Sequence, residues 1–192
     1  MHRGDAEVAV ASRVAAVIGL FFRDATAADA DAIAGLHAAS WRATYRGIVT
    51  DEFLEKAALE NLLALWRNRF SPEHAREQWV RVAIERQALA GFACVSTAAE
   101  PDWGFFLDSL HVRPDAKGRG IGRRLIAEAA AFALLQSPDA TMHLWVFERN
   151  TAARRFYDQL GGAVAEHKTG RTPDGGEAAV VRYVWRDLSV LV

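Results

Sequence analysis

The sequence predicts a single α/β (α+β) domain built on a mixed, mostly antiparallel sheet of six to seven strands, flanked by about four helices. Apolar residues first recur with a period of about 3.6 and then, from residue 79, with a period of about 2. The elements follow the order β-α-α-β-β-β-α-β-α-β-β. Three strands suited to antiparallel pairing precede a β-α-β crossover, so the sheet must be mixed.

The N-terminal segment, residues 1–17, has no clear period, and we expect a loosely ordered leader there. The apolar and aromatic stretch 18–23 predicts the first strand. The single domain is therefore assigned to residues 18–192, since the chain shows no linker, repeat or low-complexity block.

Two helices follow the first strand. Thr26 and Asp29 have the spacing of a capping box and predict a helix from there to about Ser40, whose inner face carries Ile33, Leu36 and Ser40. Residues 41–50 are expected to be irregular. A second helix is predicted over 51–70 from its leucines and aromatic residues.

A run of antiparallel strands comes next. Residues 79–85 alternate as a strand, Arg86-Gln87 forms a tight turn, and 89–97 continues as the next strand. A third strand covers 105–112 and ends before Pro114, because proline cannot donate to a ladder.

The remaining elements alternate between helix and strand. In order they are a helix over 121–136, a strand over 142–147, a helix capped by Asn150 and stopped by Gly161-Gly162, and a hairpin of 163–168 and 178–186.

Composition excludes several classes of protein. The net charge of −1 argues against a nucleic-acid partner held by overall charge. The longest uncharged run near the N-terminus, Val14 to Phe22, is too short to span a membrane. The lone Cys94 excludes an internal disulfide and favours a reducing, cytoplasmic location; we expect it to be a small buried hydrophobe. The six histidines have no ligand spacing, so no metal is expected.

The most informative segment is a glycine loop between a strand and a helix. Gly118, Gly120 and Gly122 let successive N–H groups face one concavity, which with the following helix N-terminus forms an anion site. Arg123 and Arg124 occupy positions where a P-loop needs Lys and Ser/Thr, and Arg123 also breaks the dinucleotide pattern. The spacing that fits is [QRK]-x-x-G-x-G, beginning at Lys117.

With these motifs the chain resembles the GNAT superfamily of acyl-CoA N-acyltransferases, over roughly residues 20–186. Besides the glycine loop, Asn150-x-x-Ala153-x-x-Phe156-Tyr157-x-x-x-Gly161 is similar to the family's second motif. The resemblance implies the GNAT fold and acetyl-CoA as cosubstrate. It implies that the pyrophosphate is held by the backbone around Lys117, Gly118, Arg119, Gly120, Ile121, Gly122 and Arg123.

The resemblance also implies roles for other residues. Main-chain groups of Leu110 and Val112 would bind the pantetheine arm, and Asn150 would add a polar contact besides capping its helix. Tyr157 would protonate the leaving thiolate; from sequence alone a core tyrosine is the simpler interpretation.

The base and the acceptor pocket are less directly indicated. Asp108 is the preferred base, on the expectation that it shares a strand face with Leu110; His111 would then face away, and bulk water is another option. The family's usual carboxylate two residues earlier is Phe106 here. Trp41 and Tyr45, four residues apart, would line the acceptor pocket, or else pack in the core.

The predicted function is transfer of an acetyl group to a primary amine of an unidentified small-molecule or peptide acceptor, by direct attack in a ternary complex. The alternative is a non-catalytic acyl-CoA-binding sensor. No membrane or nucleic-acid partner is expected, and a homodimer is one option. The glycine loop region, 113–124, has five basic residues and one acid, a local charge of +4 that suits a CoA phosphate site.

Overall fold

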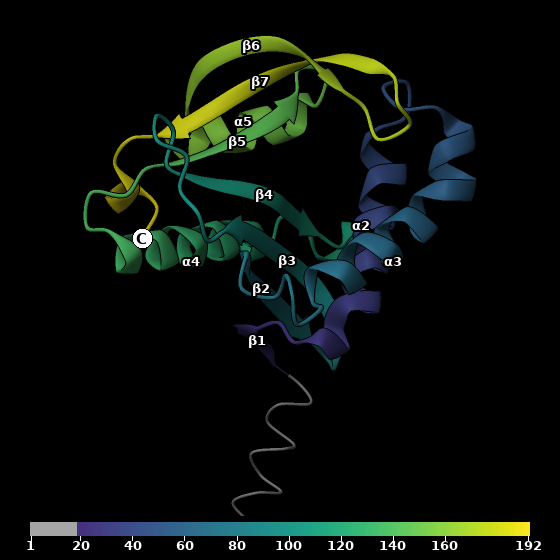
Figure 1. Ribbon diagram of the computed structural model, residues 1–192, viewed down its shortest axis with the longest axis horizontal. Coiled ribbons are helices and arrows are strands. Elements are labelled where there is room, and N and C mark those ends of the chain that lie inside the picture. The colour runs from purple at the N-terminus through teal and green to yellow at the C-terminus, as the bar shows by residue number, and fades with distance from the viewer. Residues whose placement is uncertain (1–18) are drawn as a thin grey trace, which may run out of the picture.

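A computed structural model describes residues 19–192; the expected leader and Ile18 lie outside this range. Seven strands form one sheet in the order β1-β2-β3-β4-β5-β7-β6 (Figure 1), with only β4 and β5 parallel. The strands are β1 (Leu20–Asp24), β2 (Gln78–Glu85), β3 (Ala88–Ser96), β4 (Phe105–Val112), β5 (Met142–Phe147), β6 (Ala163–Arg171) and β7 (Glu177–Trp185). The α-helices are α2 (Ala30–Thr44), α3 (Ala58–Arg69), α4 (Ile121–Gln136) and α5 (Thr151–Gln159). The predicted mixed α/β fold is confirmed.

The start of the first helical region confirms the capping box. The backbone N–H of Thr26 donates to Asp29 Oδ2 at 2.8 Å, and Arg23 also donates to that carboxylate. The box opens a short 3₁₀ turn, Ala27–Asp29, which runs into α2. This α-helix continues to Thr44, beyond the predicted end at Ser40, so the expectation of an irregular segment from residue 41 was wrong for its first four residues.

The second predicted helix is present but is not uniform. A π-helical turn over Phe53–Ala57 precedes α3. The Leu54 carbonyl accepts a hydrogen bond from Arg42 Nε at 2.9 Å, which ties this turn to α2. Leu54 itself is fully buried beneath it.

Two hydrophobic cores lie on opposite faces of the sheet. On one face, α2 and α3 cover alternate residues of β2 and β3, including Val80, Val82 and Cys94. On the other, α4 covers the intervening residues, including Ala83 and Ala93, and α5 adds Tyr157 to the same core. The predicted period of 2 in β2 therefore separates two cores, and Cys94 is a buried small residue as expected.

The β2–β3 hairpin turns at Arg86 and Gln87, both with positive φ (49° and 65°). This agrees with the predicted tight turn and with the primed turn that a two-residue hairpin requires. Within residues 19–192 no helix combines the length and apolar character needed to cross a bilayer.

The feature of the fold that creates a site is the separation of β4 from β5. Their parallel pairing is limited to Phe105 with Met142 and Phe106 with His143, although both strands continue beyond these residues. Figure 1 shows the two strands diverging from this point. The sheet is thus opened at its centre, and one edge of β4 is left without a strand partner.

Candidate active site

A cleft of about 810 Å³ occupies the gap between β4 and β5. Its walls are the second halves of these two strands, the glycine loop, the first turns of α5 and the C-terminal end of α2. Its volume lies within the range of small-molecule sites. Every predicted site residue except Trp41 and Arg119 contributes to its lining.

The free edge of β4 presents main-chain groups to this cleft. The N–H of Arg113 donates to the Ala90 carbonyl at 2.8 Å, towards β3. Because successive peptide groups of a strand point to opposite edges, the N–H groups of Val112 and Leu110 point away from β3 and into the cleft. Their side chains pack against the α4 core. At these two residues the main chain therefore faces the cleft while the side chain packs in the core.

A β-bulge interrupts β4 at Asp108. Cys94 pairs with Ser109 and Val95 pairs with Leu107, so Asp108 has no partner in β3. Across the bulge, Leu107 and Leu110 both face the α4 core. Asp108 instead reaches α3, where its Oδ2 accepts a hydrogen bond from Arg69 Nη1 at 2.6 Å. The expectation that Asp108 shares a face with Leu110 was therefore wrong, because it assumed a regular strand.

The glycine loop has the geometry of an anion cradle. Gly118 and Gly120 have φ of +74° and +80°, a conformation that L side chains rarely adopt, and a Cβ on either would meet no atom of the described chain within 4 Å. Gly120 is the N-cap of α4, whose ladder begins with the Arg124 N–H donating to the Gly120 carbonyl. The earlier N–H groups of this end have no intrahelical acceptor and lie at the positive end of the helix dipole. The concavity has donors and space, so these residues fit a phosphate group.

The local positive charge is largely balanced by acids from elsewhere in the chain. Arg113 and Arg119 both pair with Glu85 at the end of β2, and Arg124 pairs with Glu128 at 2.7 Å. Among residues 19–192, the cleft-lining Lys117 and Arg123 have no ion-pair partner. The predicted +4 therefore leaves two cations for a ligand, and the Arg119 guanidinium is directed to Glu85.

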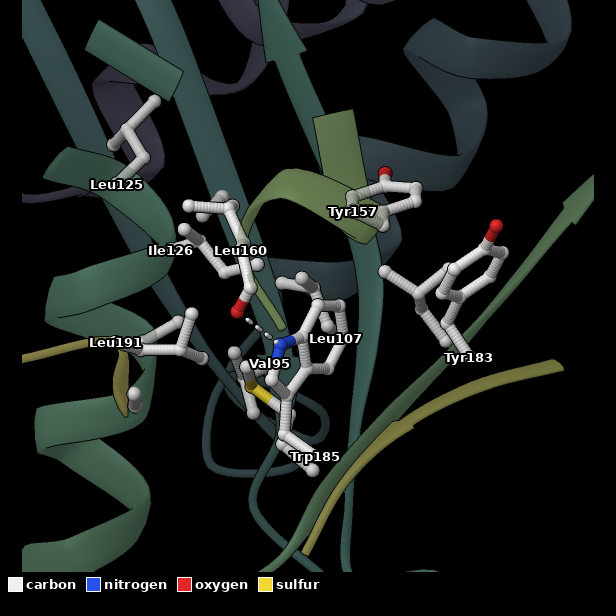
Figure 2. Packing of buried hydrophobic residues seen from close by; sticks show 14 of the residues in the cluster. Val95, Leu107, Leu125, Ile126, Tyr157, Leu160, Tyr183, Trp185 and Leu191 are labelled. Atoms are coloured by element: carbon white, nitrogen blue, oxygen red, sulfur yellow. Dashed lines mark hydrogen bonds between the residues drawn. The ribbon is translucent and has the colours of Figure 1, made fainter. Parts of the chain in front are cut away.

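Tyr157 lies on α5, above the aromatic cluster that closes the core beneath the cleft. Its ring is 5.5 Å from that of Tyr183 and 5.9 Å from that of Trp185, whose indole N–H donates to the Leu160 carbonyl at 3.0 Å (Figure 2). Burial raises the pKa of Tyr157 well above its usual value. The phenol is therefore protonated at neutral pH and lines the cleft with 8% of its surface exposed.

Asn150 caps α5 as predicted. Its Oδ1 accepts a hydrogen bond from the Ala153 N–H at 3.2 Å, and the residue also lines the cleft. The helix-capping interpretation is confirmed, and the same side chain keeps its amide group available to a ligand.

Of the two aromatic residues predicted for the acceptor pocket, the structure places only one in the cleft. Their rings are 6.0 Å apart, but only Tyr45 lines the cleft. Trp41 packs against His37 and Phe53 and belongs to the α3 side of the core. Tyr45 meets the Phe147 ring edge-on at 4.9 Å, and burial raises its pKa to about 12.

Two segments distant in sequence contact each other near the cleft-lining Arg149. The β6–β7 loop contacts the segment after α2, where Asp174 Oδ2 accepts from the Thr50 N–H at 2.8 Å. Arg149, which lines the cleft, donates to the Gly47 carbonyl of the same segment. Figure 1 shows the hairpin tip reaching the α2–α3 side of the molecule.

A serine–histidine pair in the cleft was not predicted. Ser40 Oγ lies 2.8 Å from His111 Nδ1, and both residues line the cleft. The sequence signal was a single polar residue, Ser40, on the apolar face of α2. His111 lies on the face opposite Leu110, as expected, but the sequence did not show that α2 brings Ser40 to this face.

No metal centre is evident in the part of the chain that the structure describes. Residues 19–192 contain no group of three or more His, Cys, Asp or Glu side chains arranged to hold an ion.

Comparisons with known proteins agree with this geometry. The acetyltransferase (GNAT) family matches residues 30–162. An uncharacterised N-acetyltransferase of Bacillus subtilis, YuaI, is 29% identical over 177 residues, which cover 88% of this chain and 94% of the relative.

Two solved structures show the same fold. The first is the PaiA N-acetyltransferase of Thermoplasma acidophilum in complex with coenzyme A, with a TM-score of 0.66 and 19% identity over 88% of this chain and all of that one. The second is YncA of Salmonella typhimurium with acetyl-CoA, with a TM-score of 0.62 and 19% identity over 88% and 94%.

Proposed function

The chain belongs to the GNAT family and is an N-acetyltransferase, and we propose that it transfers the acetyl group of acetyl-CoA to a primary amine by direct attack within a ternary complex. The observation that carries this proposal is the cleft itself. Its free β4 edge leads from the glycine cradle, past Tyr157, to the C-terminal end of α2, where Ser40, Thr44 and Tyr45 line the cleft. One substrate can enter from each end.

The glycine loop binds the pyrophosphate in this proposal. Gly118 and Gly120 leave open space at the positive end of α4, where the N–H groups that lack an intrahelical acceptor stabilise an anion. Lys117 and Arg123 supply the charge, since the neighbouring arginines are paired with acids. Arg119 contributes only its backbone to pyrophosphate binding, because its guanidinium is paired with Glu85.

The β4 edge binds the pantetheine arm. Leu110 and Val112 offer main-chain groups to the amides of the arm, as an added strand would. Asn150 contributes its side-chain amide from the opposite wall. The arm thereby directs the thioester to the cleft segment between Leu110 and Tyr157.

The chemical step joins the acceptor nitrogen to the thioester carbonyl carbon. The N–H of Leu110 stabilises the oxyanion of the tetrahedral adduct. The carbon–sulfur bond then breaks, and Tyr157 donates its phenolic proton to the sulfur. Proton donation of this kind contributes about 10²–10⁴-fold to the rate.

The acceptor is a small-molecule or peptide amine that enters beside Tyr45. Tyr45 presents an aromatic ring to the cleft, and this ring packs against those of Phe147 and Trp41. A spermidine N-acetyltransferase of Vibrio cholerae has the same fold, with a TM-score of 0.62. Polyamines therefore belong in the first acceptor panel.

Location and assembly are extensions of the same proposal. A buried, unpaired Cys94 thiol suits a cytoplasmic enzyme. The strand β6 ends the sheet, and its free edge is where a second copy would pair to form a homodimer.

The test is release of free thiol from acetyl-CoA in the presence of a panel of amines, with the acetylated product identified by mass spectrometry. We expect amine-dependent thiol release. If calorimetry shows acetyl-CoA binding while no amine in a broad panel is acetylated, the protein is instead an acyl-CoA-binding sensor.

A further inference from the structure

We propose that Ser40 and His111 form the relay that takes the proton from the attacking amine. The inference rests on the proposed function and adds the group that this function lacks. The Ser40 hydroxyl receives the proton from nitrogen and passes its own proton to His111 Nδ1, 2.8 Å away. Both residues line the cleft, on the side opposite the cofactor-facing core.

The position of the pair suits the reaction. His111 follows Leu110, whose N–H faces the cleft, so the relay starts one residue from the proposed oxyanion site. Ser40 lies one turn before Thr44 and Tyr45 on the wall where the acceptor enters. Tyr157 extends from the other wall. The proton donor and the proton acceptor thus approach the thioester from different elements.

The surroundings of His111 hold its imidazole in place. Its ring packs against His37 at 4.3 Å and against Phe92 at 5.3 Å between centroids. His37 is in turn fixed by Trp66, whose indole N–H donates to His37 Nδ1 at 3.2 Å. Rotation of the His111 ring away from Ser40 would break this packing.

The charge state of His111 is right for accepting a proton. Burial lowers its pKa to about 4, while Asp108 acts to raise it and Lys117 to lower it. The imidazole is therefore neutral at pH 7. Nδ1 can accept from Ser40 when the ring proton is on Nε2. Nearby Asp108 favours the imidazolium that forms.

The proton balance of the step is complete. The amine arrives uncharged, and its nitrogen becomes cationic when the carbon–nitrogen bond forms. That nitrogen loses one proton to Ser40 Oγ as the Ser40 proton moves to His111 Nδ1. The products are the amide and an imidazolium, which returns its proton to solvent. Tyr157 separately gives its phenolic proton to the CoA sulfur, and the resulting phenolate takes up one proton from solvent, which balances the proton released by His111.

Asp108 is the competing candidate, and the structure gives it other partners. Its Oδ2 accepts from Arg69 at 2.6 Å and from Ser109 Oγ at 2.8 Å. Two serine hydroxyl contacts, one to each candidate base, supply a matched pair of variants.

Ser40→Ala removes the hydroxyl that is hydrogen-bonded to His111, and Ser109→Ala removes the hydroxyl that is hydrogen-bonded to Asp108.

The kinetic experiment compares these variants on an amine that the wild type acetylates. We expect Ser40→Ala and His111→Asn each to lower kcat/KM by about 10²–10⁴-fold. The double variant should be no slower than the slower single variant, because the two residues act as one unit. Ser40→Thr should keep most of the activity, Ser109→Ala should behave as wild type, and the Kd for acetyl-CoA should not change. A loss confined to Ser109→Ala and Asp108→Asn would overturn the relay.

A second measurement does not need turnover. Two-bond ¹H–¹⁵N correlation spectra of the wild type at pH 7 report which ring nitrogen of His111 is protonated. We expect the proton on Nε2, with Nδ1 accepting from Ser40. A proton on Nδ1 would refute the relay even if the enzyme is active, whereas absence of turnover on every amine would count against the proposed function.

Discussion

Replacing Gly120 with alanine tests whether the glycine loop must keep its left-handed turn to bind acetyl-CoA. Gly120 has φ 80° and ψ −3°. A Cβ at this position would meet no described atom within 4 Å, so backbone strain is the main penalty within the protein. For an L residue that strain is about 1–2 kcal/mol, which corresponds to a factor of about 5–30 in an equilibrium constant.

The strain energy is expected to lower either the free energy of unfolding or the affinity for acetyl-CoA. If the loop keeps its conformation, the free energy of unfolding falls by about 1–2 kcal/mol and the Kd for acetyl-CoA is unchanged. If the free loop relaxes, the protein is less destabilised and the Kd rises by up to about 30-fold, because binding must restore the turn. Urea unfolding and calorimetric titration, performed on the same preparation, measure both quantities.

The control is Gly35→Ala on α2, where a Cβ also meets no described atom within 4 Å but the backbone is helical. This change should stabilise the protein by about 0.5–1 kcal/mol and leave the Kd unchanged. If Gly120→Ala alters neither stability nor affinity, the left-handed turn at the α4 N-cap is not needed, and our account of the anion cradle is wrong.

Three further predictions concern single residues. Tyr157→Phe should lower kcat by about 10²–10⁴-fold with an unchanged Kd for acetyl-CoA; unchanged turnover in steady-state assays would exclude Tyr157 as the acid. Asp29→Asn should lower the free energy of unfolding at pH 7 by about 1–2 kcal/mol. The hydrogen bond from Arg23 lowers the pKa of Asp29 to about 2, so its stabilisation exists above the unfolded value of 3.8 and is lost as pH falls towards 2. Urea titrations of both proteins at pH 7 and pH 3 should therefore show a smaller difference at pH 3. Burial raises the pKa of Cys94 to about 12, so a thiol reagent at pH 8 should modify the native protein at least about 10³-fold more slowly than the unfolded chain; equal rates would contradict the buried position.

The elements that sequence predicted best are those with local signals at both ends. The bounds of β4, α4 and β5 agree with the predicted 105–112, 121–136 and 142–147. Pro114 and the glycine loop separate the first two, and a Ser-Pro-Asp break separates α4 from β5. Residues 41–44 carry no such signal. In the structure Trp41 contacts Phe53 of the next helical region at 6.4 Å between ring centroids, a tertiary contact that propensity does not contain.

The ion pairs of the glycine loop region also depend on residues that are distant in the sequence. A count along residues 113–124 gives +4, but Glu85 lies 34 positions before Arg119 and is brought to it by the β2–β3 hairpin. Only the fold identifies Lys117 and Arg123 as the basic residues of this window that have no acidic partner among residues 19–192. A sequence window therefore locates a cluster of basic residues but does not show which of them are paired with acids from other elements.

The bulge in β4 explains why the candidate base was harder to place from the sequence than the main-chain edge proposed to bind the cosubstrate. A regular strand places residues 108, 110 and 112 on one face and residue 111 on the other. One extra residue at position 108 leaves Leu110 and Val112 with the α4 core and moves Asp108 to the face of His111. Because of the bulge, Leu110 and Val112 face the α4 core as on a regular strand, while Asp108 and His111 both face α2 and α3. A carboxylate at 108 would have served as the base on a regular strand. On the bulged strand it meets Arg69 instead, and the position nearest the acceptor wall belongs to His111 and Ser40.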